Sequence, residues 1–222
     1  MKVLVTGSSN GLGRALVNEL FNCGHQVFTY DLENGQDVRK PDIGYLQELD
    51  VLINNAGVNR INWLESVTEE DWDTVMDTNA KGIFMMTQAC LPMLITSKGT
   101  VVNIVSNAAH VPMTCSAAYN ASKGAAHILT QQLARELTKR HGITVFGVAP
   151  NRMAGTEMSH AIDKQVVATR GWGHRTARKY QLQSLLVGEE TQPDLVAEFI
   201  GWLLSKKLRH KFLSGCVLPY GV

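Results

Sequence analysis

Short apolar runs alternate along the chain with longer stretches in which apolar residues recur at helical spacing. The runs are too short for helices and predict β-strands at residues 2–6, 25–30, 51–53, 101–105, 142–150 and 214–219. Stretches between them, such as R-A-L-V-N-E-L-F-N-C from residue 14 and L-V-A-E-F-I-G-W-L-L from residue 195, predict amphipathic helices. No internal repeat or low-complexity linker interrupts this pattern, so we expect one domain.

The first predicted strand leads directly into a glycine-rich loop. The sequence Gly7-Ser8-Ser9-Asn10-Gly11-Leu12-Gly13 lies between that strand and a predicted helix. The start of a helix offers free N–H groups and a favourable dipole to a pyrophosphate, and glycines let the backbone turn tightly and approach it. The segment therefore indicates a dinucleotide-binding site.

Asp31 ends the second predicted strand, about 20 residues beyond the glycines. A carboxylate here can accept both ribose hydroxyls of NAD, and its charge would repel the 2′-phosphate of NADP. No arginine stands in the glycine loop before Leu12 or directly after Asp31 to bind that phosphate. The sequence therefore favours NAD over NADP, the alternative being that Asp31 is a solvated turn residue.

Three further residues form a pattern suited to proton transfer. Tyr119 and Lys123 are four residues apart in a predicted helix, so they share a face, and Ser106 follows the 101–105 strand. A phenol has a pKa near 10, which a neighbouring ammonium lowers, and the serine could hydrogen-bond an oxygen that reacts with the tyrosine. The pattern predicts proton exchange with a hydroxyl or carbonyl oxygen. Taken alone, Tyr-x3-Lys more often marks an amphipathic helix with one extended lysine.

Several motifs agree with this chemistry, and together they resemble the short-chain dehydrogenase/reductase family. They are T-G-x-x-x-G-x-G from Thr6, N-N-A-G from Asn54, D-T-N-A-K-G around Asn79, S-x12-Y-x3-K from Ser106, and the terminal strand. The resemblance covers residues 2–219. It implies an α/β fold, a Rossmann-like doubly wound parallel β-sheet with helices on both faces, forming a single domain over 1–222 with a substrate lid at about 157–190.

The resemblance also assigns roles to residues. The catalytic set would be Asn79, Ser106, Tyr119 and Lys123, with Asn79 binding a water that links Lys123 to solvent. The cofactor would be bound by Gly7, Ser9, Asn10, Gly11, Leu12, Gly13, Asp31, Asp37, Val38, Asn55, Ala56, Gly57, Tyr119, Lys123, Pro150 and Thr156.

Two segments depart from the family pattern. Only 20 residues lie between Asp31 and Asp50, fewer than the family uses for a helix, a strand and a second helix, so we expect a shortened crossover. After Pro150 the family has Gly, whereas this chain has Asn151 and one extra residue before Thr156. Asparagine tolerates left-handed backbone angles, so the turn is expected to persist.

The activity implied is an oxidoreductase that transfers a hydride between NAD and a secondary alcohol or ketone by a Tyr-Lys-Ser-Asn mechanism. The alternative is a catalytically silent NAD-binding sensor or scaffold protein.

Composition narrows the function by exclusion. With 45% hydrophobic and 18% charged residues and a net charge of +1, the chain reads as an ordinary folded protein, without the charge that nucleic acid or an anionic membrane would attract. The four cysteines form no C-x-x-C pair, so we expect neither a metal site nor disulfides. A strand that begins at residue 2 leaves no room for a signal peptide, which favours the cytoplasm.

The lid and the helix surfaces suggest partners. Residues 164–180 contain the basic residues Lys164, Arg170, Arg175, Arg178 and Lys179 and no acid, with aromatic residues among them. Three alternatives are open for these basic residues. They could form a solvated surface, pair with acidic residues of a neighbouring subunit, or bind an anionic group of the substrate. The family commonly associates through the helices that here carry Asn79 and Tyr119, so we expect a homodimer or homotetramer, with Met85, Met86, Leu91 and Met93 on the outer faces.

Overall fold

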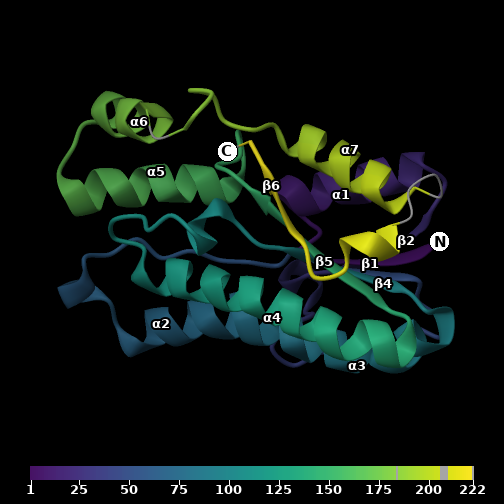
Figure 1. Ribbon diagram of the computed structural model, residues 1–222. Helices are drawn as coiled ribbons and strands as arrows, with labels where there is room; N and C mark the ends of the chain where they lie inside the picture. Colours follow the sequence, from purple (N-terminus) through teal and green to yellow (C-terminus); the bar gives the residue numbers. More distant parts are fainter. Residues whose placement is uncertain (184, 206–209, 222) are drawn as a thin grey trace.

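Six parallel strands form one sheet in the order β2-β1-β3-β4-β5-β6 (Figure 1). They are β1 (Lys2–Thr6), β2 (Gln26–Tyr30), β3 (Val51–Asn54), β4 (Thr100–Ile104), β5 (Thr144–Pro150) and β6 (Val217–Tyr220). The structure is a computed structural model and describes residues 1–183, 185–205 and 210–221. The chain moves from β1 to one side and then returns to β3 on the other, which opens a crevice at the carboxyl ends of these two strands.

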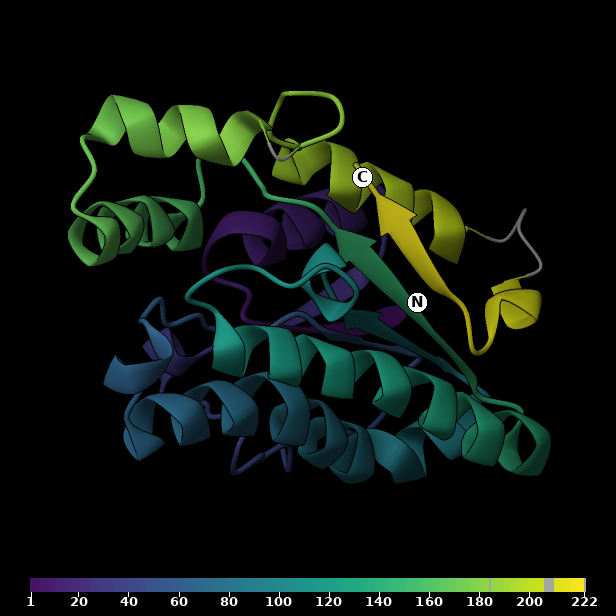
Figure 2. The same ribbon diagram turned by 60° about the vertical axis from the view of Figure 1, so that its left-hand side comes forward.

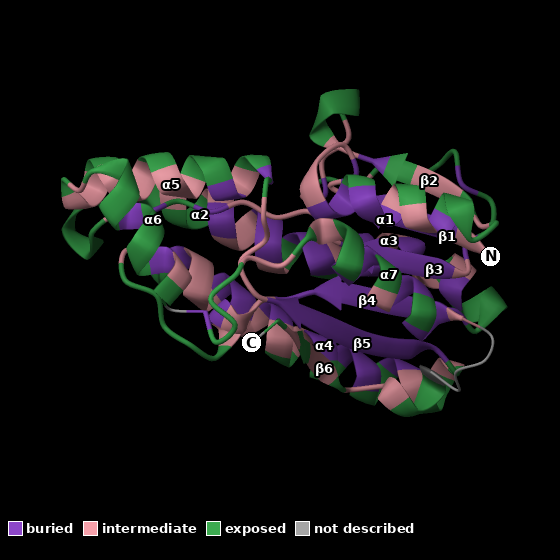
Figure 3. Ribbon diagram, turned by 90° about the horizontal axis from the view of Figure 1, so that it is seen from above, coloured by how far each residue is buried: buried purple, intermediate pink, exposed green. Residues whose placement is uncertain are grey.

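Helices cover both faces of the sheet, and the alternation of side chains along β1 shows why. Val3 and Val5 point into the core beneath α1 (Gly11–Asn22) and α7 (Pro193–Leu204), whereas Leu4 points into the core beneath α3 (Gly82–Ser97) and α4 (Ala117–His141). The central strands β1, β3, β4 and β5 are therefore buried on both faces, whereas the edge strands β2 and β6 are partly exposed (Figure 3). The doubly wound Rossmann-like fold expected from the sequence is confirmed.

The remaining helices lie near the carboxyl ends of the strands. They are α2 (Glu69–Met76), which continues through a π-helical segment (Asp77–Lys81) into α3, then α5 (Glu157–Arg170) and α6 (His174–Gln183). Short 3₁₀ turns occur at Leu32–Asn34, Leu64–Ser66, Asn107–Ala109 and His210–Leu213. Figure 2 shows α5 and α6 side by side beyond the sheet, where the sequence places the lid; residue 184 of that segment lies outside the described residues.

The crossover after β2 is short, as expected. A single 3₁₀ turn is the only helix or strand between β2 and β3, and the rest packs as loop on the α3–α4 side of the sheet through Val38, Leu46 and Leu49. The Tyr30 hydroxyl fixes this loop because it accepts a hydrogen bond from the Asp42 N–H and donates one to the Asp37 carbonyl. Buried apolar side chains replace the missing helices as the cover of the sheet.

The prediction of which α3 side chains lie on the outer face of the layer is partly wrong. Met86 is fully buried with Ile83, Cys90 and Leu94, since this side of the helix lies on the sheet, and Leu91 and Met93 are half-buried against the same core. The exposed apolar side chains of the α3–α4 layer are instead Phe84, Ile95 and Ile128.

Two absences hold for the described part of the chain. None of its helices has the length and apolar character needed to cross a membrane. Nor do its histidines, cysteines and carboxylates gather in a group that could bind a metal ion.

Candidate functional site

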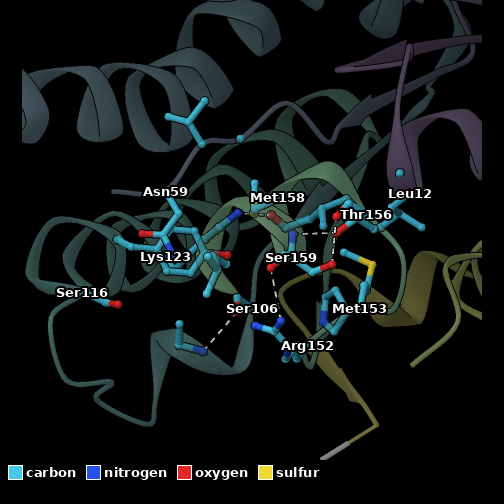
Figure 4. A pocket seen from close by; sticks show the side chains of 18 of the residues that line it. Leu12, Asn59, Ser106, Ser116, Lys123, Arg152, Met153, Thr156, Met158 and Ser159 are labelled. Atoms are coloured by element: carbon cyan, nitrogen blue, oxygen red, sulfur yellow. Dashed lines mark hydrogen bonds between the residues drawn. The ribbon is translucent and has the colours of Figure 1, made fainter. Parts of the chain in front are cut away.

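A cavity of about 1000 Å³ lies at the carboxyl ends of the strands (Figure 4). Its walls come from the ends of β1, β3, β4 and β5, the start of α4 and the lid helices α5 and α6. Of the residues predicted to bind the cofactor or react, all line it except Ser9, Gly13 and Asn79. Residues spread over most of the sequence thus meet in one space.

The glycine loop is packed so closely that side chains would not fit. A Cβ on Gly7, whose φ is +63°, would lie 2.7 Å from the Ala56 Cα, and one on Gly13 would lie 1.8 Å from the Gly7 oxygen. The Asn55 side chain holds the loop to β3 by donating to the carbonyls of Thr6 and Gly7 at 3.0 and 2.9 Å. Gly13 therefore acts through packing, which explains why it does not face the cavity.

The carboxylate of Asp31 is held in position by backbone donors. The Ser9 N–H donates to its Oδ2 at 2.9 Å, and the Glu33 N–H donates to its Oδ1 at 3.1 Å. Ser9 thus contacts Asp31 and does not line the cavity. Beside it, Glu33 accepts a hydrogen bond from the Asn10 side chain at 3.0 Å. This end of the cavity is negatively charged.

Asp37 and Val38 do reach the cavity, although the crossover is short. Asp37 forms a bidentate ion pair with Arg39, whose hydrogen bonds hold the pKa of the carboxyl below its usual range. Val38 is buried against Gly82. At the opposite side of the glycine loop the Thr156 side chain lies close to Gly11, and its Oγ1 caps α5 by accepting from the Ser159 N–H.

Ser106, Tyr119 and Lys123 meet where β4 ends beside the first turn of α4. The Lys123 Nζ is buried and donates to the Ile104 carbonyl at 2.9 Å, and it lies 5.7 Å from the centroid of the Tyr119 ring. The Ser106 hydroxyl accepts a hydrogen bond from the Ala108 N–H at 3.2 Å, and it lies close enough to the Tyr119 phenol to act against the rise of that group's pKa. The spacing in the sequence therefore corresponds to real proximity.

The electrostatics of this cluster differ from the expectation. Burial raises the pKa of the Tyr119 phenol, an effect that the hydrogen bond from Ser106 opposes, and burial lowers the pKa of Lys123 to about 8. The sequence predicts instead that the ammonium lowers the pKa of the tyrosine. Desolvation disfavours the charged form of both groups, and it is the largest cause of both shifts.

Asn79 lies one layer behind the cavity, in the π-helical segment. Its Oδ1 accepts from the Val58 N–H at 2.8 Å, and its Nδ2 donates to the Val58 carbonyl and to the Ser122 Oγ. The hydrogen bonds of the Asn79 side chain thus join the loop after β3 to α4. The water expected from the resemblance would have to bind the Asn79 backbone.

Asn59 is a site residue that the sequence reasoning did not single out. Its side chain is only 7% exposed and lines the cavity, and neither its Oδ1 nor its Nδ2 has a hydrogen-bond partner among the described residues (Figure 4). A buried amide without partners is costly, so a ligand that hydrogen-bonds it would be stabilised. The only signal in the sequence was its position two residues after the N-N-A-G motif.

The basic residues of the lid have different surroundings. Arg178 makes a bidentate ion pair with Glu190, which also binds Arg152. Arg175 is exposed and does not line the large cavity. Arg170 alone among the five lines it.

Comparison with known proteins agrees with this geometry. Residues 36–167 match the short chain dehydrogenase family. The chain is 31% identical over 243 residues to the 3-oxoacyl-[acyl-carrier-protein] reductase FabG of Staphylococcus aureus, an alignment that covers 96% of this chain and 93% of the relative. The protein belongs to the short chain dehydrogenase family.

Solved structures support the same assignment. A short chain dehydrogenase family protein from Francisella tularensis superposes with a TM-score of 0.86 at 25% identity, covering 98% of this chain and 96% of that one. Actinorhodin polyketide ketoreductase with NADPH superposes equally well, at 25% identity over 98% of this chain and 94% of that one. The chain is thus an oxidoreductase by family.

Proposed function

We propose that the protein transfers a hydride between a nicotinamide cofactor and a secondary alcohol or ketone. The observation that carries the proposal is the meeting of Ser106, Tyr119 and Lys123 in the cavity that the glycine loop and Asp31 also line. The glycine loop fits a pyrophosphate, because α1 begins at Gly11 and the first N–H groups of a helix have no acceptor within it.

The chain's own residues bind, orient and exchange a proton. The Ser106 hydroxyl would hydrogen-bond the oxygen of the substrate, on which negative charge develops during reduction of a carbonyl. The Tyr119 hydroxyl would give its proton to that oxygen in reduction and accept one in oxidation. A phenol, with an ordinary pKa near 10, is protonated at neutral pH, which is the form needed as the acid in reduction. The nicotinamide, when bound, supplies or accepts the hydride.

Lys123 and the lid would complete the site. The Lys123 ammonium, which reaches the same cavity, would bind the cofactor ribose and lower the barrier to proton release from Tyr119. We propose that residues 157–190 act as a lid that excludes water from the reacting groups. The Asn59 amide would hydrogen-bond a polar group of the bound ligand.

The cofactor preferred is proposed to be NAD. The described basic residues that line the cavity are Lys123, Arg152 and Arg170, none of which belongs to the crossover around Asp31. With Asp31 and Glu33 together on one turn, the 2′-phosphate of NADP would meet negative charge. The nearby Arg39 is already paired with Asp37. A relative, actinorhodin polyketide ketoreductase, is described with NADPH, so the two cofactors must be compared directly.

The test is a turnover assay of the purified protein with secondary alcohols and ketones, each with NAD(H) and NADP(H). Turnover by the unmutated protein that depends on either cofactor supports an enzyme. Saturable NAD binding without turnover of any substrate would support the alternative, a silent sensor or scaffold.

A further inference from the structure

We infer that the end of the cavity formed by the last turn of α5 recognises an anionic group, a carboxylate or phosphate, on the substrate, and that Arg170 binds it. This inference rests on the proposed function, since it names the class of substrate that the site would accept.

One face of α5 forms a wall of the cavity from end to end. Met158, Ile162, Val166 and Arg170 are spaced by four residues, so they follow one another along the helix, and all four line the cavity. Thr156, just before the helix, lies against Gly11 of the glycine loop. At 1.5 Å per residue, Arg170 is about 20 Å farther along this wall. The wall is thus apolar over most of its length and ends in a guanidinium, away from the expected pyrophosphate site.

Three aromatic rings lie around the Arg170 guanidinium. Its Cζ lies 4.7 Å from the centroid of the Trp172 ring, 4.9 Å from that of Tyr180 and 5.9 Å from that of Trp63. Contacts of this kind occupy none of the guanidinium N–H groups with an acceptor oxygen, so those donors remain available to a ligand. The side chain is therefore oriented before a ligand arrives, which reduces the entropy lost on binding.

Arg170 also lacks the carboxylate partners that its neighbours have. Arg178 and Arg152 are paired with Glu190 and Asp163, whereas none of the ion pairs within the described residues includes Arg170. A guanidinium edge without a carboxylate is free to accept a bidentate oxyanion.

Hydrogen bonds join the loop after β3 to the end of α5, beside Arg170. Trp63 belongs to the loop after β3, and its Nε1 donates to the Thr169 carbonyl at the end of α5 at 3.0 Å. The Thr169 hydroxyl and the Gln165 side chain bind the Ile61 backbone in the same seam. A substrate bound by Arg170 would therefore lie next to the hydrogen bonds that join the end of α5 to the loop after β3.

These contacts point to a substrate with an oxygen that reacts at Tyr119, an aliphatic chain along α5, and an anionic group at its far end. A carboxylate and a phosphate offer the same fork of oxygens, so the test includes both sources. Neutral alcohols and ketones would lack the final contact.

The experiment compares matched anionic and neutral ketones in the parent, Arg170→Met and Arg170→Lys proteins. The probes are 3-oxobutanoate, 4-oxopentanoate, 5-oxohexanoate and 6-oxoheptanoate against their methyl esters, and dihydroxyacetone phosphate against dihydroxyacetone. Arg175→Met is the matched control, because it removes a lid arginine that is exposed and does not line the cavity.

We expect the parent to prefer the anion over its neutral counterpart at one chain length. Arg170→Met should raise the KM for that anion at least about tenfold with a small change in kcat, and leave the neutral compound unaffected. The KM of Arg170→Lys for the anion should lie between those of the parent and Arg170→Met, since lysine keeps the positive charge but cannot make the bidentate hydrogen bonds of a guanidinium. If every variant treats anion and neutral partner alike, the inference is wrong while the proposed function stands.

A binding measurement separates failure of the inference from failure of the proposed function. If no carbonyl is turned over, the proposed function fails, and titration with hexanoate and hexanamide then decides the inference through the fluorescence of Trp63 and Trp172. Saturable quenching by hexanoate alone, lost in Arg170→Met, supports an anion site. Equal responses to both probes, or a response unchanged by the substitution, overturn it.

Discussion

The Nζ of Lys123 lies 5.7 Å from the centre of the Tyr119 ring, and both groups share one turn of α4 at the floor of the cavity. Neither has a carboxylate partner among the described ion pairs. Burial raises the pKa of the phenol, which Ser106 partly opposes, and it lowers the pKa of the amine to about 8. At neutral pH the buried Lys123 ammonium therefore destabilises the fold.

That cost predicts a stability that rises in alkaline solution. The pKa of Lys123 is about 8 in the fold against 10.5 for an ordinary lysine, so between these values the unfolded chain binds more protons and stability increases with pH. The penalty is fully present below pH 8 and amounts to about 3 kcal/mol at 1.36 kcal/mol per pKa unit. Lys123→Met should remove this rise. Urea unfolding from pH 7 to 10.5 measures it, with the exposed Lys139→Met as control; parallel curves for parent and Lys123→Met would contradict the prediction.

Tyr119→Phe should abolish turnover and keep cofactor binding within a few fold. The ring still packs at the start of α4, and only the hydroxyl that exchanges the proton is lost. Positioned acid–base catalysis is typically worth about 10²–10⁴-fold, so kcat should fall by at least that lower bound. Steady-state kinetics and a cofactor titration give the two values. A variant that keeps more than about a tenth of the parent kcat would show that another group moves the proton.

Asp31→Ser should narrow the preference for NAD over NADP. The substitution removes one negative charge facing the 2′-phosphate while a hydroxyl can still accept from the Ser9 N–H that now binds the carboxylate. The ratio of kcat/KM values for the two cofactors measures the effect, with Glu33→Gln as a comparison for the second acid on the turn. Equal kcat/KM for NAD and NADP in the parent would show that the carboxylate does not select the cofactor.

Elements with strong local signals could be predicted from the sequence, and those set by tertiary contacts could not. The strands and the glycine loop followed from apolar runs and glycine spacing, and the proximity of Ser106 to Tyr119 followed from the motif that joins them. The loop between Asp31 and Asp50 has no apolar periodicity, because only single side chains such as Leu46 and Leu49 cover the sheet there. Sequence spacing likewise could not distinguish Arg178, which is paired with Glu190 after α6, from Arg170, which lines the cavity.

Arg152→Met should loosen the lid. Arg152 joins Asp163 of α5 at 2.6 Å and Glu190 after α6 at 2.5 Å, and Glu190 is only 6% exposed in its side chain. Burial would raise the pKa of Glu190, but hydrogen bonds from Arg178 and Arg152 hold it below the ordinary range, so the cluster is charged at neutral pH. Breaking a buried pair costs about 3–5 kcal/mol, and the remaining Arg178 places the expected loss near the lower value. Urea unfolding measures this loss, and faster proteolysis within residues 157–190 locates it.

Arg175→Met is the control, because it removes an exposed lid arginine and should change neither the free energy of unfolding nor the rate of proteolysis. If Arg152→Met gives the same result as Arg175→Met, the cluster does not hold the lid.

The outer face of the α3–α4 layer should bind a second copy of the chain. Ile128 is 63% exposed in the middle of α4, and Phe84 and Ile95 are 43% and 37% exposed on the adjoining α3. Exposed apolar side chains gathered on one layer commonly mark an interface, and members of this family are expected to associate through these helices. Ile128→Glu places a charge at the centre of that contact and should shift the protein toward monomer without unfolding it, since the side chain is not part of the core.

Phe21→Glu is the matched control, because Phe21 is 70% exposed on α1 at the opposite face of the sheet. Sedimentation at micromolar concentration compares the three proteins. A monomeric parent would show that this face binds no second copy, and a dimer that survives Ile128→Glu would show that the interface lies elsewhere.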